Sequence, residues 1–371
     1  MKYYLIAGEA SGDLHGSNLI KQLKTLDTNS QIRCWGGDKM ADAGGDLVMH
    51  FKKLAFMGFV EVIKNLKTIL SLLSFCKKDI LSFHPDVLVL IDYPGFNLRI
   101  AKWAKKQGIK VVYYITPQVW AWHKSRVHDL GKYTDLLIVI LPFEPKFFNH
   151  FGYKTLYVGH PLLDAIHNFS PDDQALKLIS GDKEILALLP GSRKQEIKTM
   201  LPVMLQACKN QPYHIVIAAA PSIDAAIYEQ IIADSGLAIK PTLLKNQTYT
   251  LLSKARYAFV SSGTATLETA LFDVPQVVCY KGNIISYHIA KRLIDLKYIS
   301  LVNLIADEEV IKELIQNDLT AENLANELKK LEEHRNQIID EYKSLKSLLG
   351  DRGASERAAR AIVELLNPEK V

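Results

Sequence analysis

The stretch KYYLIAGEASGDLHG, at Lys2–Gly16, joins an apolar run, a turn rich in small residues and the start of a segment with helical spacing. A short apolar run that ends at glycine and leads into a helix is typical of a strand in a parallel α/β sheet. The run is interrupted by Gly8, Glu9 and Asp13, too early for the apolar core of a signal peptide. We therefore expect the first β-strand at Lys2–Ala7.

The same alternation continues along the chain in two series, with a junction around Leu162–Asp182. In the first series we expect strands at Lys2–Ala7, Ile32–Trp35, Val87–Ile91, Val111–Ile115 and Leu136–Ile140, with helices at Leu14–Leu26 and Leu98–Lys106. In the second we expect strands at Glu184–Leu189, His214–Ala218, Tyr257–Val260 and Gln276–Cys279, with helices near Lys194–Lys209 and Thr264–Phe272. This order predicts an α/β protein of two doubly wound parallel-sheet domains, followed by a helical tail over Ala321–Leu366.

Length and composition agree with two globular domains. The chain has 371 residues, of which 48% are hydrophobic and 23% charged, and these values exclude a disordered or low-complexity protein. The net charge of +5 suits an anionic partner but is too small to indicate nucleic-acid binding. The four cysteines form no CxxC pair, and no apolar run approaches the roughly 18 residues of a transmembrane helix. We expect reduced thiols, no metal site and no membrane-spanning segment.

The loop after the first strand of the first domain carries candidate binding residues. Around Gly12, small residues and a following helix present N–H groups to an anion or a sugar hydroxyl. The glycines at 8, 12 and 16 do not form the GxGxxG fingerprint of dinucleotide enzymes. Asp13 has two interpretations, a functional carboxylate or the cap of a helix that starts at Leu14.

Two further loops of the first domain also follow predicted strands. One brings Asp92 to the carboxyl end of a buried strand, where partial burial raises the pKa of a carboxyl and suits it to general-base chemistry. We expect Asn97 to cap the next helix, which leaves Asp92 available for function. The other loop, Ile115–His123, holds two tryptophans, a glutamine and a histidine. Aromatic faces with polar neighbours suit sugar rings or acyl chains, although paired tryptophans also anchor cores.

A loop of the second domain, LPGSR, has the composition of a diphosphate site. Gly191 and Ser192 supply backbone donors, and Arg193 supplies a planar cation with several N–H groups. The lysine and hydroxyl pair of a Walker loop is absent from this motif, so it is not the phosphate loop of an ATPase. We therefore interpret it as one part of an anion site.

The motif SSGTATLE, at Ser261–Glu268, is the strongest single element of the second domain. Hydroxyls and N–H groups at the start of a helix favour phosphate oxygens. Glu268 lies one turn inside the predicted helix on the face of Thr264, where a carboxylate can accept both hydroxyls of a ribose. The competing interpretation is a capping box, for which Glu268 lies too far along the helix.

The segment Leu54–Cys76 is more apolar than a surface helix requires, and lysines such as Lys52, Lys53, Lys77 and Lys78 flank it. Apolar bulk with a cationic rim is typical of an interfacial helix on anionic lipid, or of a groove for acyl chains. Packing between a sheet and a helix explains the apolar character as well. The clustered lysines favour the membrane.

Together these motifs resemble one family closely, the lipid-A-disaccharide synthases, inverting glycosyltransferases of bacterial outer-membrane lipid synthesis. In chain order the blocks are GEASGD at Gly8–Asp13, MGFVEV at Met57–Val62, IDYPGFN at Ile91–Asn97, TPQVWAWH at Thr116–His123, LPFE at Leu141–Glu144, VGHP at Val158–Pro161, LPGSRKQEI at Leu189–Ile197, SSGTATLE at Ser261–Glu268 and SLVNLIA at Ser300–Ala306. They span nearly the whole chain, whereas SGTATLE alone indicates only a nucleotide-sugar enzyme.

The resemblance implies a GT-B fold, in which two Rossmann-like domains face a central cleft. The domain over 1–165 would bind the acceptor and face the membrane, completed by C-terminal helices from 341–371, and the domain over 166–340 would bind the UDP-sugar donor. The implied reaction joins UDP-2,3-diacylglucosamine to the 6-hydroxyl of 2,3-diacylglucosamine 1-phosphate. It gives a β-1′,6-linked disaccharide and UDP, with neither a metal nor a cofactor.

The resemblance also assigns roles to matching residues. Asp92 becomes the general base, and Arg193 and Asn303 are expected near the donor. The residues expected to hold the UDP-sugar are Gly12, Gly191, Ser192, Arg193, Ser262, Gly263, Thr264, Glu268 and Gln316. The family pattern often carries an aspartate where this chain has Gly95. The implied setting is cytoplasmic, on the inner leaflet of the inner membrane, with a possible homodimer and no nucleic-acid partner.

Two other functions share the nucleotide-sugar loop. A UDP-sugar 2-epimerase has the same fold but handles one water-soluble substrate, which leaves the lysine-rimmed apolar segment without a purpose. A non-catalytic UDP-sugar-binding protein keeps the SGTATLE loop but gives no reason for Asp92 at a strand end. An oxidoreductase is disfavoured because the dinucleotide fingerprint is missing.

Overall fold

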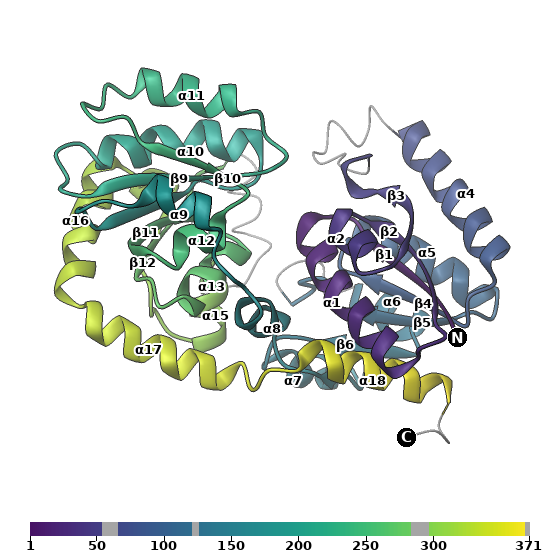
Figure 1. Ribbon diagram of the computed structural model, residues 1–371. Coiled ribbons are helices and arrows are strands. Elements are labelled where there is room, and N and C mark those ends of the chain that lie inside the picture. The colour runs from purple at the N-terminus through teal and green to yellow at the C-terminus, as the bar shows by residue number, and fades with distance from the viewer. Residues whose placement is uncertain (54–65, 121–125, 283–296, 368–371) are drawn as a thin grey trace. The chain divides into compact units, whose positions relative to one another are not determined.

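The computed structural model describes residues 1–53, 66–120, 126–282 and 297–367, and its strands form two separate parallel sheets (Figure 1). The chain divides into two units, Met1–Ala165 with Asp351–Val371, and Ile166–Gly350. The second boundary lies after Gly350 rather than at 340, so α17 (Arg335–Leu348) belongs to the second unit. Only α18 (Ala354–Leu366) completes the first unit.

The first unit is a seven-stranded sheet of order β3-β2-β1-β4-β5-β6-β7. Its strands are β1 (Lys2–Ala7), β2 (Gln31–Gly36), β3 (Asp46–His50), β4 (Val87–Ile91), β5 (Lys110–Tyr114), β6 (Leu136–Val139) and β7 (Leu156–Tyr157). Its helices are α1 (Ala10–Leu26), α2 (Asp38–Asp42), η1 (Phe51–Lys53), α4 (Leu66–Phe83), α5 (Pro94–Lys106), α6 (Arg126–Tyr133), α7 (Glu144–His150) and α8 (Pro161–His167), with α18. All five strands expected in this part of the chain are present. The sequence missed the two edge strands, β3 and β7.

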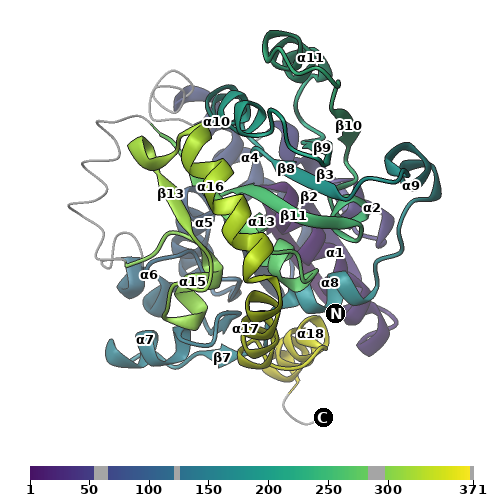
Figure 2. The ribbon, with the colours of Figure 1, turned by 90° about the vertical axis from the view of Figure 1, so that its left-hand side faces the viewer.

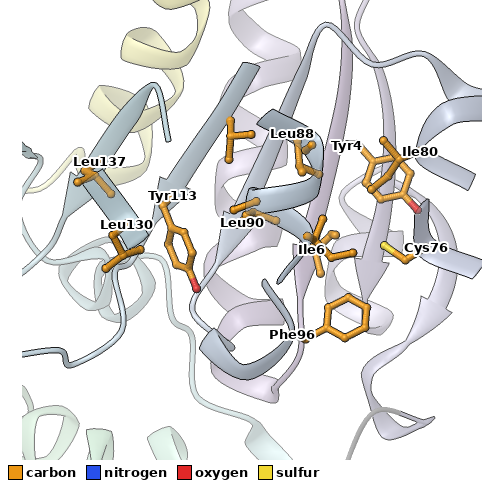
Figure 3. Packing of buried hydrophobic residues seen from close by; sticks show 14 of the residues in the cluster. Tyr4, Ile6, Cys76, Ile80, Leu88, Leu90, Phe96, Tyr113, Leu130 and Leu137 are labelled. Carbon is orange, nitrogen blue, oxygen red and sulfur yellow. The ribbon is translucent and has the colours of Figure 1, made fainter. Parts of the chain in front are cut away.

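The core of the first unit follows the two-residue period of its strands. Alternate residues of β1, β4 and β5, such as Ile6, Leu90 and Tyr113, point to the side covered by α4, α5 and α6 (Figure 3). Phe96 of α5 and Ile80 of α4 complete this layer. The helix α1 packs against α18. Because the central strands are covered by helices, their sequences are apolar at nearly every position.

Two charged groups hold the outer helices of this unit in place. Asp79 of α4 accepts hydrogen bonds from both Nε and Nη2 of Arg33 in β2, at 2.9 and 2.7 Å, and from the hydroxyl of Tyr4 at 2.5 Å. Asp164 accepts the backbone N–H groups of Gly353 and Ser355, at 2.6 and 3.0 Å, at the start of α18. A carboxylate at this position satisfies donors that a helix cannot pair itself. The C-terminal helix is thereby fixed to the first unit.

The second unit repeats the architecture with a six-stranded sheet of order β10-β9-β8-β11-β12-β13. Its strands are β8 (Ile185–Leu189), β9 (His214–Ala219), β10 (Thr242–Lys245), β11 (Ala255–Ser261), β12 (Gln276–Tyr280) and β13 (Glu313–Ile315). Its helices are α9 (Asp173–Ile179), α10 (Lys194–Ala207), α11 (Ala225–Asp234), α12 (Thr248–Leu252), α13 (Thr264–Leu271), α15 (Leu301–Ala306), η2 (Gln316–Asp318), α16 (Ala321–Glu333) and α17. Helices α10 and α16 pack against each other (Figure 2). The four expected strands are present, and again the edge strands, β10 and β13, were missed.

Both sheets reverse their strand order at the centre. In the first unit the reversal lies between β1 and β4, and in the second between β8 and β11. At such a point, the loops that follow the two neighbouring strands run in opposite directions. A crevice forms between them at the carboxyl ends of the strands, and doubly wound sheets bind ligands there. The loops at these two reversals are the ones that begin at Gly8, Asp92, Pro190 and Ser262.

Candidate active site

Asp92 follows β4 directly at the reversal of the first sheet. Its backbone is left-handed, with φ of +45°, and so is that of Tyr93, with φ of +49°. Directly after the neighbouring strand β5, Ile115 has φ of +61°, which is rare for a β-branched residue. Left-handed residues other than glycine cost about 1–2 kcal/mol each, and such residues gather at functional sites. The surrounding structure must therefore hold Asp92 in this conformation.

Asn97 and Tyr113 supply that restraint. The Asn97 side chain is fully buried, and its Nδ2 lies 3.3, 3.2 and 2.8 Å from the carbonyl oxygens of Ile6, Ile91 and Asp92. The Tyr113 hydroxyl also donates to the Asp92 carbonyl, at 2.7 Å. The expectation that Asn97 caps the helix was wrong, because α5 already begins at Pro94. Asn97 instead ties the carboxyl ends of β1 and β4 together beneath Asp92.

The carboxyl of Asp92 has an unusual proton affinity. Burial, reinforced by the negative charge of Glu9, raises its pKa from the ordinary value near 4 to about 7. The backbone N–H of Tyr93 opposes the shift only in part. A carboxyl with a pKa near neutrality gains and loses its proton near pH 7, which suits a general base.

The loop after β1 packs closely on the Asp92 loop. A Cβ atom at Gly8 would lie 2.3 Å from the ring of Tyr93, so only glycine allows this approach. Gly12 is buried inside α1, where a Cβ atom would lie 3.0 Å from that of Ala7, so the position allows close packing of helix on strand. Its predicted role in holding a ligand stays a prediction.

Asp13 is a structural carboxylate. The helix α1 begins at Ala10, so Asp13 does not cap it. The Asp13 carboxylate instead accepts the N–H groups of Gly37, Lys39 and Met40, at 2.7, 3.2 and 3.0 Å, at the start of α2. Of the acidic residues in the loop after β1, Glu9 is thus the one near Asp92.

The loop after β5 is anchored by Glu144, which the sequence did not single out beyond its place in LPFE. Its buried carboxyl accepts the hydroxyl of Thr116 at 3.0 Å and the N–H groups of Ile140 and Leu141 at 3.1 and 2.8 Å. Burial raises the pKa of Glu144 to about 7 against these hydrogen bonds. Trp120 packs edge-on against Phe143. Residues 121–125, which include His123, lie outside the described residues.

In the second unit, the loop after β8 surrounds a carboxylate. Glu196 of α10 accepts the backbone N–H groups of Ser192 and Arg193, at 3.2 and 3.3 Å, and its other oxygen lies 3.4 Å from Nη1 of Arg193. Gly191 lies beside it with φ of +109°. The donors that the sequence predicted for a diphosphate therefore hold an anionic side chain in this structure, which a diphosphate would have to displace.

The loop after β11 opens α13. Gly263 precedes the helix with φ of +151° and ψ of −164°, a conformation that is essentially restricted to glycine. The Ser262 hydroxyl donates to the carbonyl of Ile299 at 3.1 Å. Thr264 and Glu268 lie one turn apart on the helix, and the Tyr249 hydroxyl donates to Oε1 of Glu268 at 2.7 Å. Gly263 is exposed and Ser262, Thr264 and Glu268 are partly exposed, as a binding loop requires.

Asn303 is fully buried, and its amide is fully engaged. Its Nδ2 donates to the carbonyl of Ile311 and to the carboxylate of Glu313, at 2.8 and 2.9 Å. Its Oδ1 accepts the N–H groups of Val310 and Ile311, both at 3.0 Å. An amide can make four such bonds, so Asn303 has no further capacity for a ligand in this arrangement. Its contacts are those of a residue that positions the segment before β13.

Gln316 differs from Asn303. It lies at the end of β13 with a left-handed backbone, φ of +55°, and is 8% exposed. Its Nε2 is buried and has no hydrogen-bond partner in the described part of the chain. A buried amide donor without a partner costs free energy, which a ligand acceptor at this edge of the sheet would recover.

Within the described ranges, no group of three or more histidine, cysteine, aspartate or glutamate side chains could hold a metal ion. No helix in those ranges is both long and apolar enough to span a bilayer.

Comparison with known sequences decides the family. The family model described as Lipid-A-disaccharide synthetase matches residues 3–365. The lipid-A-disaccharide synthase of Syntrophus aciditrophicus is 39% identical, over 98% of this chain and 97% of that protein. The chain belongs to the lipid-A-disaccharide synthase family. As a member of this family, it is a glycosyltransferase of lipid A biosynthesis.

Solved structures agree on the fold. The UDP-GlcNAc 2-epimerase of Neisseria meningitidis, solved with UDP-GlcNAc, matches with a TM-score of 0.70 at 14% identity over 98% of this chain and all of that one. The calicheamicin glycosyltransferase CalG4 matches with a TM-score of 0.60 at 18% identity, over all of this chain and 99% of that one. At these identities the likeness establishes the GT-B fold alone, and the choice between transferase and epimerase rests on the sequence family.

The raised pKa of Asp92 predicts a pH-dependent gain in stability for Asp92→Asn. The folded protein holds this proton more tightly than the unfolded chain, so wild-type stability falls as pH rises from about 4 to about 7. The amide variant has no carboxyl proton to lose, so we expect the substitution Asp92→Asn to be more stabilising at pH 8 than at pH 4, by about 3–4 kcal/mol. Denaturant unfolding at the two pH values measures it. Asp42→Asn, at an exposed carboxylate, is the control, and an equal effect of Asp92→Asn at both pH values contradicts the prediction.

Proposed function

We propose that the protein transfers 2,3-diacylglucosamine from UDP to the 6-hydroxyl of 2,3-diacylglucosamine 1-phosphate. The reaction gives the β-1′,6-linked disaccharide 1-phosphate and UDP, with inversion at the anomeric carbon. The observation that carries the proposal is Asp92, in a chain of this family: its backbone carbonyl is held by Asn97 and Tyr113 at the carboxyl end of β4, and its buried carboxyl has a pKa of about 7.

Asp92 acts as the general base in this proposal. An inverting transfer is a single displacement. The carboxylate removes the proton of the acceptor hydroxyl while the oxygen of that hydroxyl bonds to the anomeric carbon. The bond from that carbon to the diphosphate oxygen breaks in the same step, and UDP leaves. No covalent intermediate with the protein is needed. The hydrogen bonds from Asn97 and Tyr113 fix the backbone of Asp92, from which the carboxyl projects.

The second unit holds the donor and stabilises the leaving diphosphate. The N-terminus of α13, with Ser262, Gly263 and Thr264, provides N–H groups and hydroxyls for phosphate oxygens. Arg193 adds a cation beside Gly191 and Ser192. Glu268 accepts the ribose hydroxyls and Gln316 donates to the nucleotide, which completes the site. We propose that these groups act without a metal or cofactor, and that Asn303 contributes by positioning.

A UDP-sugar 2-epimerase and a non-catalytic UDP-sugar-binding protein are the alternatives. The epimerases share the fold with this chain, but the identity of 39% to a named synthase favours transfer. A binding protein gains nothing from holding the backbone of Asp92 in a left-handed conformation that costs free energy. Release of UDP distinguishes the three functions, because only the transferase requires the acceptor for it.

We expect Asp92→Asn to abolish acceptor-dependent UDP release. Loss of a positioned general base lowers the rate by about a hundredfold or more. The assay gives the purified protein UDP-2,3-diacylglucosamine with and without the monosaccharide 1-phosphate, and Asp42→Asn serves as the control with wild-type rate. UDP release without acceptor would assign a hydrolase or an epimerase-like enzyme, and the absence of release would favour the binding protein.

Both substrates carry acyl chains, and we propose that α4 docks the protein on the inner leaflet of the bacterial inner membrane. Leu70, Phe75 and Leu81 of α4 are 57%, 44% and 45% exposed, and Lys67 and Lys78 are exposed as well. At 100° per residue, both leucines and both lysines fall on one side of the helix. Apolar side chains between lysines suit the surface of an anionic bilayer.

The remaining part of the apolar segment is not described. Residues 54–65 of Leu54–Cys76 lie outside the described residues, so the proposal rests on α4. The cytoplasmic location belongs to the same proposal, because the nucleotide-sugar donor is made there. The homodimer that the resemblance allows stays a prediction.

Replacing Leu70 and Leu81 together with serine tests the docking. Burial of one leucine is worth about 1.5–3 kcal/mol, so the double variant should bind vesicles of anionic phospholipid at least about tenfold more weakly. Cosedimentation with the vesicles measures this. Leu178→Ser, which removes a leucine that is 64% exposed on α9, is the matched control. Unchanged binding of the double variant, or an equal loss in the control, contradicts the proposal.

A further inference from the structure

Tyr249 belongs to no sequence motif, yet it makes direct contact with the site of the second unit. Its hydroxyl donates to Oε1 of Glu268 at 2.7 Å, from α12 to α13 (Figure 1). Burial, together with the charge of Glu268, raises the pKa of Tyr249 well above its ordinary value near 10. The phenol therefore keeps its proton near neutral pH and is the donor in this hydrogen bond.

The ring of Tyr249 is held by two phenylalanines. Its centroid lies 5.5 Å from that of Phe169, edge to face, and 5.3 Å from that of Phe272. Phe169 and Phe272 also contact each other edge-on, at 5.9 Å. Such pairs favour specific angles, so the three rings fix the direction of the phenol. Phe272 follows Glu268 by one helical turn, which links the ring cluster to the helix that carries the carboxylate.

A glutamate on a helix surface has three rotatable side-chain bonds, and ordering such a side chain costs up to about 2 kcal/mol of entropy. A donor that already holds one carboxylate oxygen removes part of this cost before a ligand arrives. The carboxylate has about four acceptor positions, of which the phenol uses one. The hydrogen bond thus orients the group without consuming its capacity to accept others.

The position of Glu268 indicates which part of a ligand it meets. It lies four residues beyond Thr264 on the same face, about 6 Å along the helix from the N–H groups proposed for the diphosphate. In a nucleoside diphosphate, the sugar ring with its two adjacent hydroxyls follows the phosphates. A carboxylate that accepts a hydrogen bond from each of the two hydroxyls must be held in one orientation, because each hydrogen bond requires a carboxylate oxygen at a suitable distance and angle.

We propose that Tyr249 is a positioning residue that orients Glu268 toward the two ribose hydroxyls of the donor, and so sets the preference for ribonucleotide over 2′-deoxyribonucleotide. This inference rests on the proposed function, in which UDP occupies the second unit. It assigns the preference to a hydrogen-bonded pair rather than to Glu268 alone.

The test compares the binding of UDP and of 2′-deoxy-UDP by calorimetry. We expect wild type to prefer UDP by about tenfold or more, because the deoxynucleotide leaves a charged acceptor without its donor. Tyr249→Phe keeps the ring and removes only the hydroxyl, and we expect it to lower the ratio of the two affinities by about fivefold, mainly by weakening UDP. The KM for the donor should rise while kcat at saturating donor stays within about twofold.

Three further variants separate this role from loss of structure. Tyr228→Phe removes another buried tyrosine hydroxyl of the same unit, which accepts the N–H of Ala220 at 3.0 Å, and should leave the affinity ratio unchanged. In a Glu268→Gln background, Tyr249→Phe should change the ratio by less than about twofold, since the two residues act through one contact. Phe169→Leu loosens the ring cluster while Tyr249 remains, and should lower the ratio partially.

The outcomes distinguish the inference from the function beneath it. If wild type binds no UDP, the proposed function itself fails. If wild type prefers UDP and Tyr249→Phe retains the full preference, the positioning role is wrong while the function stands. Should Tyr249→Phe fold too poorly to measure, an unchanged ratio in Phe169→Leu overturns the inference in the same way.

Discussion

The reversal of strand order at the centre of each sheet is the constraint on which both candidate sites depend. A parallel strand buried on two faces can carry few polar side chains, so chemistry must come from the loops at its carboxyl end. In the first unit the loops after β1 and β4 bring Glu9 and Asp92 together, and in the second the loops with the predicted phosphate-binding groups leave the neighbouring strands β8 and β11. In the proposed function, the same topology serves a general base in one unit and an anion site in the other.

The site of the first unit stores strain and opposes it with hydrogen bonds. Asp92 and Tyr93 occupy left-handed conformations, and the charged form of Asp92 is disfavoured by burial and by Glu9. Two donors on the Asp92 carbonyl, from Asn97 and Tyr113, hold this arrangement. These features lower stability, and they place a carboxyl of nearly neutral pKa on a restrained backbone. A conflict between local preference and structure is expected where function demands it.

The sequence predicted the nine central strands and the loops that follow them, because buried parallel strands are continuous apolar runs between turn residues. It missed β3, β7, β10 and β13, which lie at sheet edges and are short or partly exposed, so their sequences lack such a run. Asp92, Arg193 and the Ser262–Thr264 loop were predicted as site residues from their place after strands, and the structure places each of them directly after a strand or at the helix start that follows it.

The partners of these residues could not be predicted, since they are distant in sequence. Asp13 caps a helix that begins some 25 residues later, and Tyr249 reaches Glu268 from another helix. The prediction that Asn97 caps a helix was wrong because a polar residue near a helix start resembles a cap in the sequence. The helix α5 begins three residues before Asn97, at Pro94. Asn303 likewise matched a motif, but only the structure reveals that its amide is fully used within its own unit.

The central claim is that Asp92 is a general base whose pKa is set by its surroundings, and the pH dependence of acceptor-dependent UDP release tests it most directly. The wild-type rate should rise with pH through a limb near pH 7, where Asp92 loses its proton. In Glu9→Gln the neighbouring charge is gone, so this limb should move to lower pH. A limb that stays in place, or an enzyme whose rate does not depend on pH in this range, would contradict the account.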